Sequence, residues 1–233
     1  MQMKFIRTAV LFLIFCVFVL PAKAAVKLPA VFSENMVLQR GMKVPVWGWA
    51  SAGEKIVAEI GGHIAETVTD EKGRWKLYLG PLDTGGPFNL TIRGENTVRV
   101  GNVLVGEVWV CSGQSNMAME VRSCRNAEQE IEQADYPDIR YFQVKRTKAS
   151  EPLQDVLPVE NPENSWLNRW HECSPSTVAH LTGVGYFFGR NVYENLDVPV
   201  GLISASWGGT TAEAWTPMDT LIHDPDLNRI LQN

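Results

Sequence analysis

The chain has 233 residues and a formal net charge of −5, from 26 acidic and 21 basic side chains. An acidic surface disfavours nucleic acid or an anionic membrane as a partner, because both are bound through basic clusters that displace counterions. The charge therefore favours chemistry on a small molecule or a glycan.

The first 24 residues have the organisation of a secretory signal peptide. Lys4 and Arg7 precede an apolar stretch at 9–20, and a small-x-small cleavage pattern ends at Ala24. The stretch is shorter than the ~20 residues that span a bilayer, which favours cleavage over an uncleaved anchor. We expect cleavage after Ala24 and a secreted or periplasmic protein with no membrane span. The charge becomes −8 once three cations leave with residues 1–24.

Residues 26–101 predict an antiparallel β-sandwich domain. Their short alternating runs show no helical period and are separated by turns rich in glycine and proline. The expected strands are 44–49, 55–60, 74–79, 88–93 and 97–100.

The pattern changes in residues 102–233, which predict an α/β domain. Apolar strands are expected at 103–111, 139–144 and 198–205, with helices at 127–134 and 176–196 between them. The residues Ser174-Pro175-Ser176 supply N-cap and first-turn signals for the second helix. Strands that alternate with helices predict a parallel sheet. The polar segment at 145–163 is expected to be a surface loop.

Ser115 stands where the first strand of the α/β region gives way to a helix. The apolar run stops at Gly113, and a serine at such a turn presents its hydroxyl at the carboxyl edge of a parallel sheet. Ser115 is therefore a candidate nucleophile, and its backbone N–H is a candidate oxyanion donor. The alternative is a serine that caps the helix. The lipase-type G-x-S-x-G elbow does not fit, because Met117 replaces its second glycine.

Gly208 and Gly209 follow the last expected strand, at the same edge of the sheet as Ser115. A loop without side chains lets a backbone N–H approach a substrate oxygen closely, which makes either glycine a candidate oxyanion donor. The alternative is a tight turn without a catalytic role.

Several segments together resemble a known family. The block Gly113-Gln114-Ser115-Asn116-Met117 is similar to the nucleophile block of sialate O-acetylesterases, which belong to the SGNH-type esterases. Residues 28–40 and 44–50 resemble the N-terminal β domain of that family. Gly189-Arg190 and the segments 198–203, 206–210 and 212–215 resemble the second conserved block of the family.

The resemblance implies both a fold and a reaction. The fold is a β-sandwich followed by the first half of a flavodoxin-like, SGNH-type α/β/α hydrolase domain. The reaction is the removal of O-acetyl groups from a sugar or glycan through an acyl-Ser115 intermediate, without metal or organic cofactor. One of Gly208 and Gly209 corresponds to the oxyanion glycine of the family.

The histidines depart from the family pattern. SGNH-type esterases take their base from a D-x-x-H pair, whereas Asp219 and His223 have D-x-x-x-H spacing, which favours a solvated or capping histidine. No pattern brings His63, His171 or His180 to Ser115, and the Gln-Gly-Glu segment of the family is absent. We therefore expect the hydrolase domain to be incomplete at its C-terminus and inactive by itself.

Two other functions stay open at this level. One is a different carbohydrate acetylesterase, such as an acetylxylan esterase; the other is a non-catalytic carbohydrate-binding or scaffold protein. The tryptophans Trp109, Trp207 and Trp215 fit core or wall positions better than sugar platforms. No cysteine and histidine spacing resembles a zinc site.

Three cysteines follow the signal segment, and an odd number allows one bridge and one buried thiol. Cys111, at the end of an apolar strand, is the candidate buried thiol. Cys124 and Cys173 are then the candidate bridge.

Overall fold

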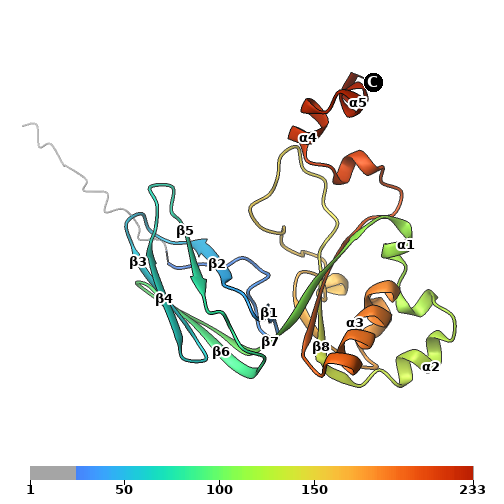
Figure 1. The fold of residues 1–233 in the computed structure, drawn as a ribbon, viewed down its shortest axis with the longest axis horizontal. Coiled ribbons are helices and arrows are strands. Elements are labelled where there is room, and N and C mark those ends of the chain that lie inside the picture. The colour runs from blue at the N-terminus through green and yellow to red at the C-terminus, as the bar shows by residue number, and fades with distance from the viewer. Residues whose placement is uncertain (1–24, 233) are drawn as a thin grey trace, which may run out of the picture.

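The computed structural model describes residues 25–232, and Figure 1 shows β-strands on one side of the molecule and helices packed beside strands on the other. The predicted signal peptide lies outside the described residues. No helix within 25–232 is long and apolar enough to cross a membrane. The strands are β1 (Val37–Gln39), β2 (Val44–Trp49), β3 (Lys55–Ile60), β4 (His63–Val68), β5 (Arg74–Leu79), β6 (Gly85–Arg93), β7 (Thr97–Gly113), β8 (Tyr136–Gln143), β9 (Trp170–Cys173) and β10 (Val200–Ser206). The helices are α1 (Ser115–Ala118), α2 (Ala127–Glu132), α3 (Gly183–Leu196), α4 (Met218–His223) and α5 (Pro225–Asn228).

The N-terminal strands enclose one apolar core. The strands β2 and β5 form an antiparallel pair, and their inward side chains share a buried cluster with β3 and β6. The strands expected at 44–49, 55–60 and 74–79 are confirmed. Strand β4 was not predicted from the sequence; it is an edge strand that pairs with β3 and alternates between half-buried and exposed side chains.

Strand β7 joins the two parts of the molecule. Figure 1 shows it as the long green strand that leaves the N-terminal strands and ends beside the helices. Its first half pairs antiparallel with β6, and residues 107–113 pair parallel with β10. The expected domain boundary at 101–102 therefore falls within a single strand. The apolar core also continues across it, because Phe142 of β8 and Trp170 of β9 belong to the N-terminal cluster.

The second half of the chain forms the expected parallel strands. Strand β10 lies between β7 and β8 and is parallel to both, so the three predicted parallel strands are confirmed. Strand β9, which the sequence analysis missed, pairs antiparallel with β8. A second core of buried residues lies between these strands and the helices, and includes Ile139, Tyr186 and Leu202. The fold is thus mixed α/β around one large sheet.

The predicted start of the long helix is wrong. Helix α3 begins at Gly183, and its N-cap is Thr182, whose hydroxyl accepts a hydrogen bond from the Gly185 N–H at 3.4 Å. The serine and proline signals belong instead to a separate turn, in which the Ser174 N–H donates to the Thr177 hydroxyl. Both segments carry capping residues, and tertiary packing decides which one starts the helix.

The expected bridge between Cys124 and Cys173 is also wrong, because both residues are free thiols in the structure, as is Cys111. Cys173 is buried in the second core, whereas Cys124 is half-buried and its thiol donates to the Glu120 carbonyl. The prediction that Cys111 is buried is confirmed. Burial raises the pKa of Cys173 to about 12, and it also raises the pKa of Cys111 and of Cys124.

Cysteine reactivity tests this arrangement. Because a thiolate is the reactive form, we expect iodoacetamide at pH 8 to modify Cys124 first and to leave Cys111 and Cys173 unmodified until the protein unfolds. Peptide mapping by mass spectrometry measures the order. A Cys124–Cys173 disulfide in the non-reduced map would contradict the structure.

Arg140 of β8 links the C-terminal strands to β7, the strand that both parts of the molecule share. Its side chain is buried and donates hydrogen bonds to the carbonyl and side-chain oxygens of Asn102 in β7 and to the Pro137 carbonyl. It also forms an ion pair with Glu172 of β9 at 3.5 Å. A buried guanidinium is tolerated because these acceptors satisfy it.

Removal of this buried cation should destabilise the fold. We expect Arg140→Met to lower the free energy of unfolding by about 3 kcal/mol, because the Asn102 and Pro137 oxygens and the Glu172 carboxylate lose their shared donor. The control is Arg93→Met, which removes an exposed ion pair with Glu59 and should cost below about 1 kcal/mol. Urea unfolding measures both, and equal losses would show that Arg140 has no special role.

Candidate active site

Ser115 occupies the predicted strand-to-helix turn. Strand β7 ends at Gly113, α1 begins at Ser115, and the Ser115 side chain is exposed. The N-cap of α1 is Gln114, whose Oε1 accepts from the Ser115 N–H at 3.4 Å and from the Ser115 hydroxyl at 3.2 Å. The capping role considered for Ser115 therefore belongs to Gln114, and the serine hydroxyl is presented at the sheet edge.

The structure brings the predicted glycine loop against Ser115. Strand β10 pairs with β7 so that Ser206 lies opposite Gly113, and the Trp207 N–H donates to the Gly113 carbonyl at 2.8 Å. A Cβ atom placed on Gly208 would lie 3.4 Å from the Ser115 Cα atom. The absence of a side chain at Gly208 thus allows the close approach.

Gly209 has a different reason to be glycine. Its φ is +79°, in the left-handed region that glycine adopts without strain, and a Cβ atom there would meet nothing within 4 Å. Gly208 and Gly209 are equivalent candidates in the sequence. The structure shows that Gly208 lies against Ser115, whereas Gly209 makes the turn of the loop.

Two hydrogen bonds restrain the glycine loop, and we call them its brace. The Trp215 indole N–H donates to the Thr210 hydroxyl, which donates to the Trp207 carbonyl, both at 2.7 Å. Trp215 is partly exposed and belongs to this brace, whereas Trp109 of β7 packs edge-to-face on Phe188 of α3. These contacts agree with structural roles for both tryptophans.

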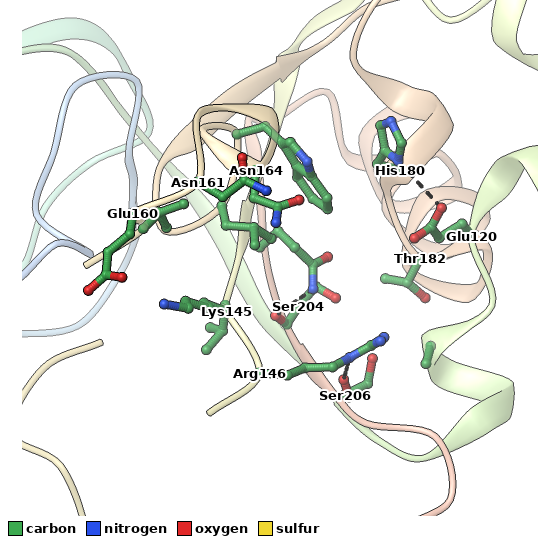
Figure 2. A pocket seen from close by; sticks show the side chains of 16 residues that line it. Glu120, Lys145, Arg146, Glu160, Asn161, Asn164, His180, Thr182, Ser204 and Ser206 are labelled. Atoms are coloured by element: carbon green, nitrogen blue, oxygen red, sulfur yellow. Dashed lines mark hydrogen bonds and ion pairs between the residues drawn. The ribbon is translucent and has the colours of Figure 1, made fainter. Parts of the chain in front are cut away.

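A cavity of about 440 Å³ opens beside the end of α1, and Figure 2 shows the side chains that line it. Ala118 and Ser206 belong to its lining, whereas Ser115 and Gly208 do not. Its walls come from α1 and the segment after it, from the carboxyl ends of β8 and β10, and from the loop that the sequence analysis treated as a plain surface connection. The polar or aromatic lining residues that no sequence pattern indicated include Glu120, Lys145, Arg146, Asn161, Asn164, Trp166 and His180. Their scatter over four segments hides them from any linear motif.

One wall of the cavity carries a histidine and a carboxylate. His180 Nδ1 lies 3.4 Å from Glu120 Oε2, and the Trp166 ring stacks on the imidazole with centroids 4.9 Å apart. Glu120 also forms an ion pair with Arg122 at 2.6 Å. No sequence pattern brings His180 to Ser115, whereas the structure puts His180 in the cavity that Ala118 of α1 also lines.

The other described histidines lie elsewhere. His63 belongs to β4, and His171 is half-buried in β9, where it donates to the Trp166 carbonyl at 2.7 Å and where burial lowers its pKa. His223 Nδ1 lies 2.7 Å from the Asp219 carbonyl, in agreement with the capping interpretation. Within residues 25–232, no histidine is hydrogen-bonded to the Ser115 hydroxyl, whose partner is Gln114.

Comparison with known proteins places the chain in a class. Residues 105–231 match the model of the carbohydrate esterase family described as sialic acid-specific acetylesterase. The matched region includes both the Ser115 turn and the glycine loop. The chain belongs to this family of carbohydrate esterases.

Individual relatives agree with this assignment. The chain is 36% identical over 199 residues to a sialate O-acetylesterase of Rattus norvegicus, and the alignment covers 78% of the chain and 35% of the relative. It is 34% identical to a sialate O-acetylesterase of Homo sapiens, over 79% of the chain and 37% of the relative. The chain thus spans a little over a third of the length of these relatives.

A solved structure resembles the fold. A carbohydrate acetylesterase from Xanthomonas citri superimposes with a TM-score of 0.78 and 30% sequence identity. The match covers 86% of this chain and 44% of the solved chain, and it therefore extends beyond the family model into the N-terminal strands.

Proposed function

We propose that this protein is a serine carboxylic-ester hydrolase that removes O-acetyl groups from sugars, with Ser115 as the nucleophile. The observation that carries the proposal is the contact between the exposed Ser115 turn and Gly208 at one edge of the sheet. An exposed serine and a loop without side chains are the parts that acyl transfer needs at one place. The family relatives named sialate O-acetylesterase support the choice of an acetylated sugar as substrate.

The proposed reaction proceeds through an acyl-serine. Ser115 Oγ attacks the acetyl carbonyl carbon while a general base takes its proton, and the sugar oxygen leaves with that proton. Water then attacks the acyl-Ser115 carbonyl and releases acetate. No described histidine is hydrogen-bonded to the Ser115 hydroxyl, so the proposal assigns no residue within 25–232 as the general base.

The oxyanion donors follow from the same geometry. The Ser115 N–H is held by Gln114 Oε1 at a long 3.4 Å, so that a substrate oxygen can replace this acceptor. We assign the second donor to the Gly208–Gly209 loop, with Gly208 as the glycine that faces Ser115. The Trp215 and Thr210 brace keeps this loop in place before substrate arrives.

The proposal includes an architecture and a location. We propose that residues 26–101 act as a β-sandwich leader and residues 102–233 as an SGNH-type hydrolase part. Strand β7 pairs antiparallel with β6 as far as Val105 and parallel with β10 from Glu107, so the change in pairing lies a few residues after this boundary. The composition of residues 1–24 supports export to the periplasm or the exterior, with cleavage after Ala24.

Substitution of the nucleophile tests the reaction. In the protein expressed from its complete gene, Ser115→Ala should reduce acetate release from O-acetylated sialic acid by at least about 10³-fold, because the acyl-enzyme cannot form. The thermal unfolding midpoint should stay unchanged, since the exposed hydroxyl has one local partner. A fluorophosphonate probe should label Ser115 in the wild type.

The control for this test is Ser112→Ala, which removes another exposed serine near the end of β7. It should retain both turnover and labelling. Labelling at Ser112, or full activity in Ser115→Ala, would contradict the assignment.

Residues 25–233 expressed separately should show turnover at least about 10³-fold below that of the complete protein, because a serine without its base loses most of its rate.

Substitution of Gly208 tests the loop. A Cβ atom at this position would already lie 3.4 Å from the Ser115 Cα atom. The two methyl groups of a valine would extend toward Ser115 from there and would push the loop away. We expect kcat to fall about 10²-fold, the typical cost of one lost oxyanion donor, with a smaller change in stability.

The matched control is Gly101→Val in β7. This glycine also has an ordinary φ, and its Cβ would lie 3.6 Å from Asn89 Oδ1, away from Ser115. Its kcat should stay within about twofold of the wild type. Unchanged turnover in Gly208→Val would place the oxyanion donors elsewhere.

A further inference from the structure

We propose that the N-terminal strands carry a second binding surface, which holds the protein on an anionic polysaccharide. The surface is the outer face of β2 and β5, the side of this antiparallel pair that points away from the apolar core. It shares no residue with the cavity beside α1, and the inference does not rest on the proposed function. The outer face consists of Lys27, Trp47, Trp49, Arg74, Lys76 and Tyr78.

The strand register places aromatic rings and cations side by side on this face. Successive side chains of a strand point to opposite sides, and the inward ones of β2 and β5 are buried in the N-terminal core. On the outer side, Trp47 lies opposite Lys76. Trp49 has Arg74 opposite it in β5 and Lys27 opposite it in an isolated β-bridge. Each tryptophan therefore has a cation as its cross-strand neighbour.

Two rings of the outer face are held in place and still exposed. The Trp47 ring packs edge-to-face on Phe32, with centroids 4.6 Å apart, and the Lys76 ammonium lies 5.1 Å from the centroid of the Tyr78 ring. Trp47 is 37% exposed and Tyr78 is 53% exposed. Rings that are already ordered offer contact area to a ligand at a low entropic cost. The face is thus prepared for stacking.

The outer face is basic, although the chain as a whole is acidic. Lys27 and Lys76 are exposed, and neither forms an ion pair with another residue of 25–232. Arg74 is paired with Asp70 at 3.2 Å, and Glu151 lines the groove beside Trp47. Because salt screens exposed charges beyond about 8 Å, a ligand on this face meets the local cations rather than the net charge. The excess of positive charge favours an anionic ligand.

The shape of the outer face favours a polymer. Outward side chains that follow one another along a strand are ~7 Å apart, so the face can contact several sugar units at once. The C–H faces of the sugars can stack on the rings while their acidic groups approach the lysines. Trp47 also lines a groove of about 790 Å³, which extends the surface beyond the two strands.

A polysaccharide fits this protein better than a nucleic acid, which is also an anionic chain. Residues 1–24 have the composition of an export signal, and the chain belongs to a family of carbohydrate esterases. Both observations place the protein where polysaccharides are the available anionic polymers.

Direct binding tests the inference. We would measure dissociation constants of the protein expressed from its complete gene for polygalacturonate, dextran sulfate, neutral dextran and a DNA duplex. The wild type should bind polygalacturonate or dextran sulfate at least about tenfold more tightly than dextran or DNA. The two anionic polysaccharides decide whether the acidic group is a carboxylate or a sulfate. Added salt should weaken the binding, since it screens exposed charges.

Variants of the outer face identify the residues that bind. Lys76→Gln and Tyr78→Ala should each weaken binding of the anionic polysaccharide by about fivefold or more. The matched controls are Arg99→Gln, which removes an exposed cation of β7 in the other sheet, and Ile64→Ala, which removes an exposed apolar side chain of β4. Both controls should stay within about twofold of the wild type. Thermal unfolding of each variant checks that the fold is retained.

Four outcomes would overturn the inference. They are no binding of either anionic polysaccharide, equal binding of dextran, equal binding of DNA, and unchanged binding in both Lys76→Gln and Tyr78→Ala. Ser115→Ala should bind the polysaccharide as the wild type does, and Tyr78→Ala should hydrolyse 4-nitrophenyl acetate at the wild-type rate. Failure of the ester-hydrolase proposal therefore shows as turnover without Ser115, and failure of this inference shows only in binding.

Discussion

The parallel register between β7 and β10 is the constraint on which the site depends. Ser206 lies opposite Gly113, and the chain leaves both strands at the same edge, so that Ser115 and Gly208 emerge in contact. A slip of one residue would turn the side chains of a strand to the opposite face and would separate the turn from the loop. At the start of the pairing, Gly106 allows the Pro199 carbonyl to approach where any side chain would collide. A backbone contact far from the site therefore helps to set its geometry.

The N-terminal strands also contribute to the cavity, through the loop that follows β8. The Ala30 N–H donates to Asp155 at 3.1 Å, and the Trp49 indole donates to Gln154 at 3.2 Å. The same loop continues to Asn161 and Asn164, which line the cavity. The N-terminal part thus supports one wall of the site from outside. These hydrogen bonds to Asp155 and Gln154 therefore join the two parts of the molecule, in addition to their shared core and the strand β7.

The two sides of the site differ in how firmly they are held. The serine turn and the glycine loop follow directly from paired strands, and hydrogen bonds within the loop restrain it further. The opposite wall consists of a long loop in which polar side chains are exposed. Such an arrangement places a firmly held serine turn beside a wall whose exposed loop is less restrained.

The sequence by itself determined the features that depend on neighbouring residues. Hydrophobic periodicity and turn residues located most strands, and the abrupt stop at Gly113 identified Ser115, because a strand-to-helix turn leaves a local pattern. Only the tertiary structure decided the start of α3, the unpaired state of Cys124 and Cys173, and the pairing of the edge strands β4 and β9. It also decided that Gly208 touches Ser115 and that Arg146, Trp166 and His180 meet in one cavity. These features depend on contacts between residues far apart in the chain, and such contacts leave no periodic signal in the sequence.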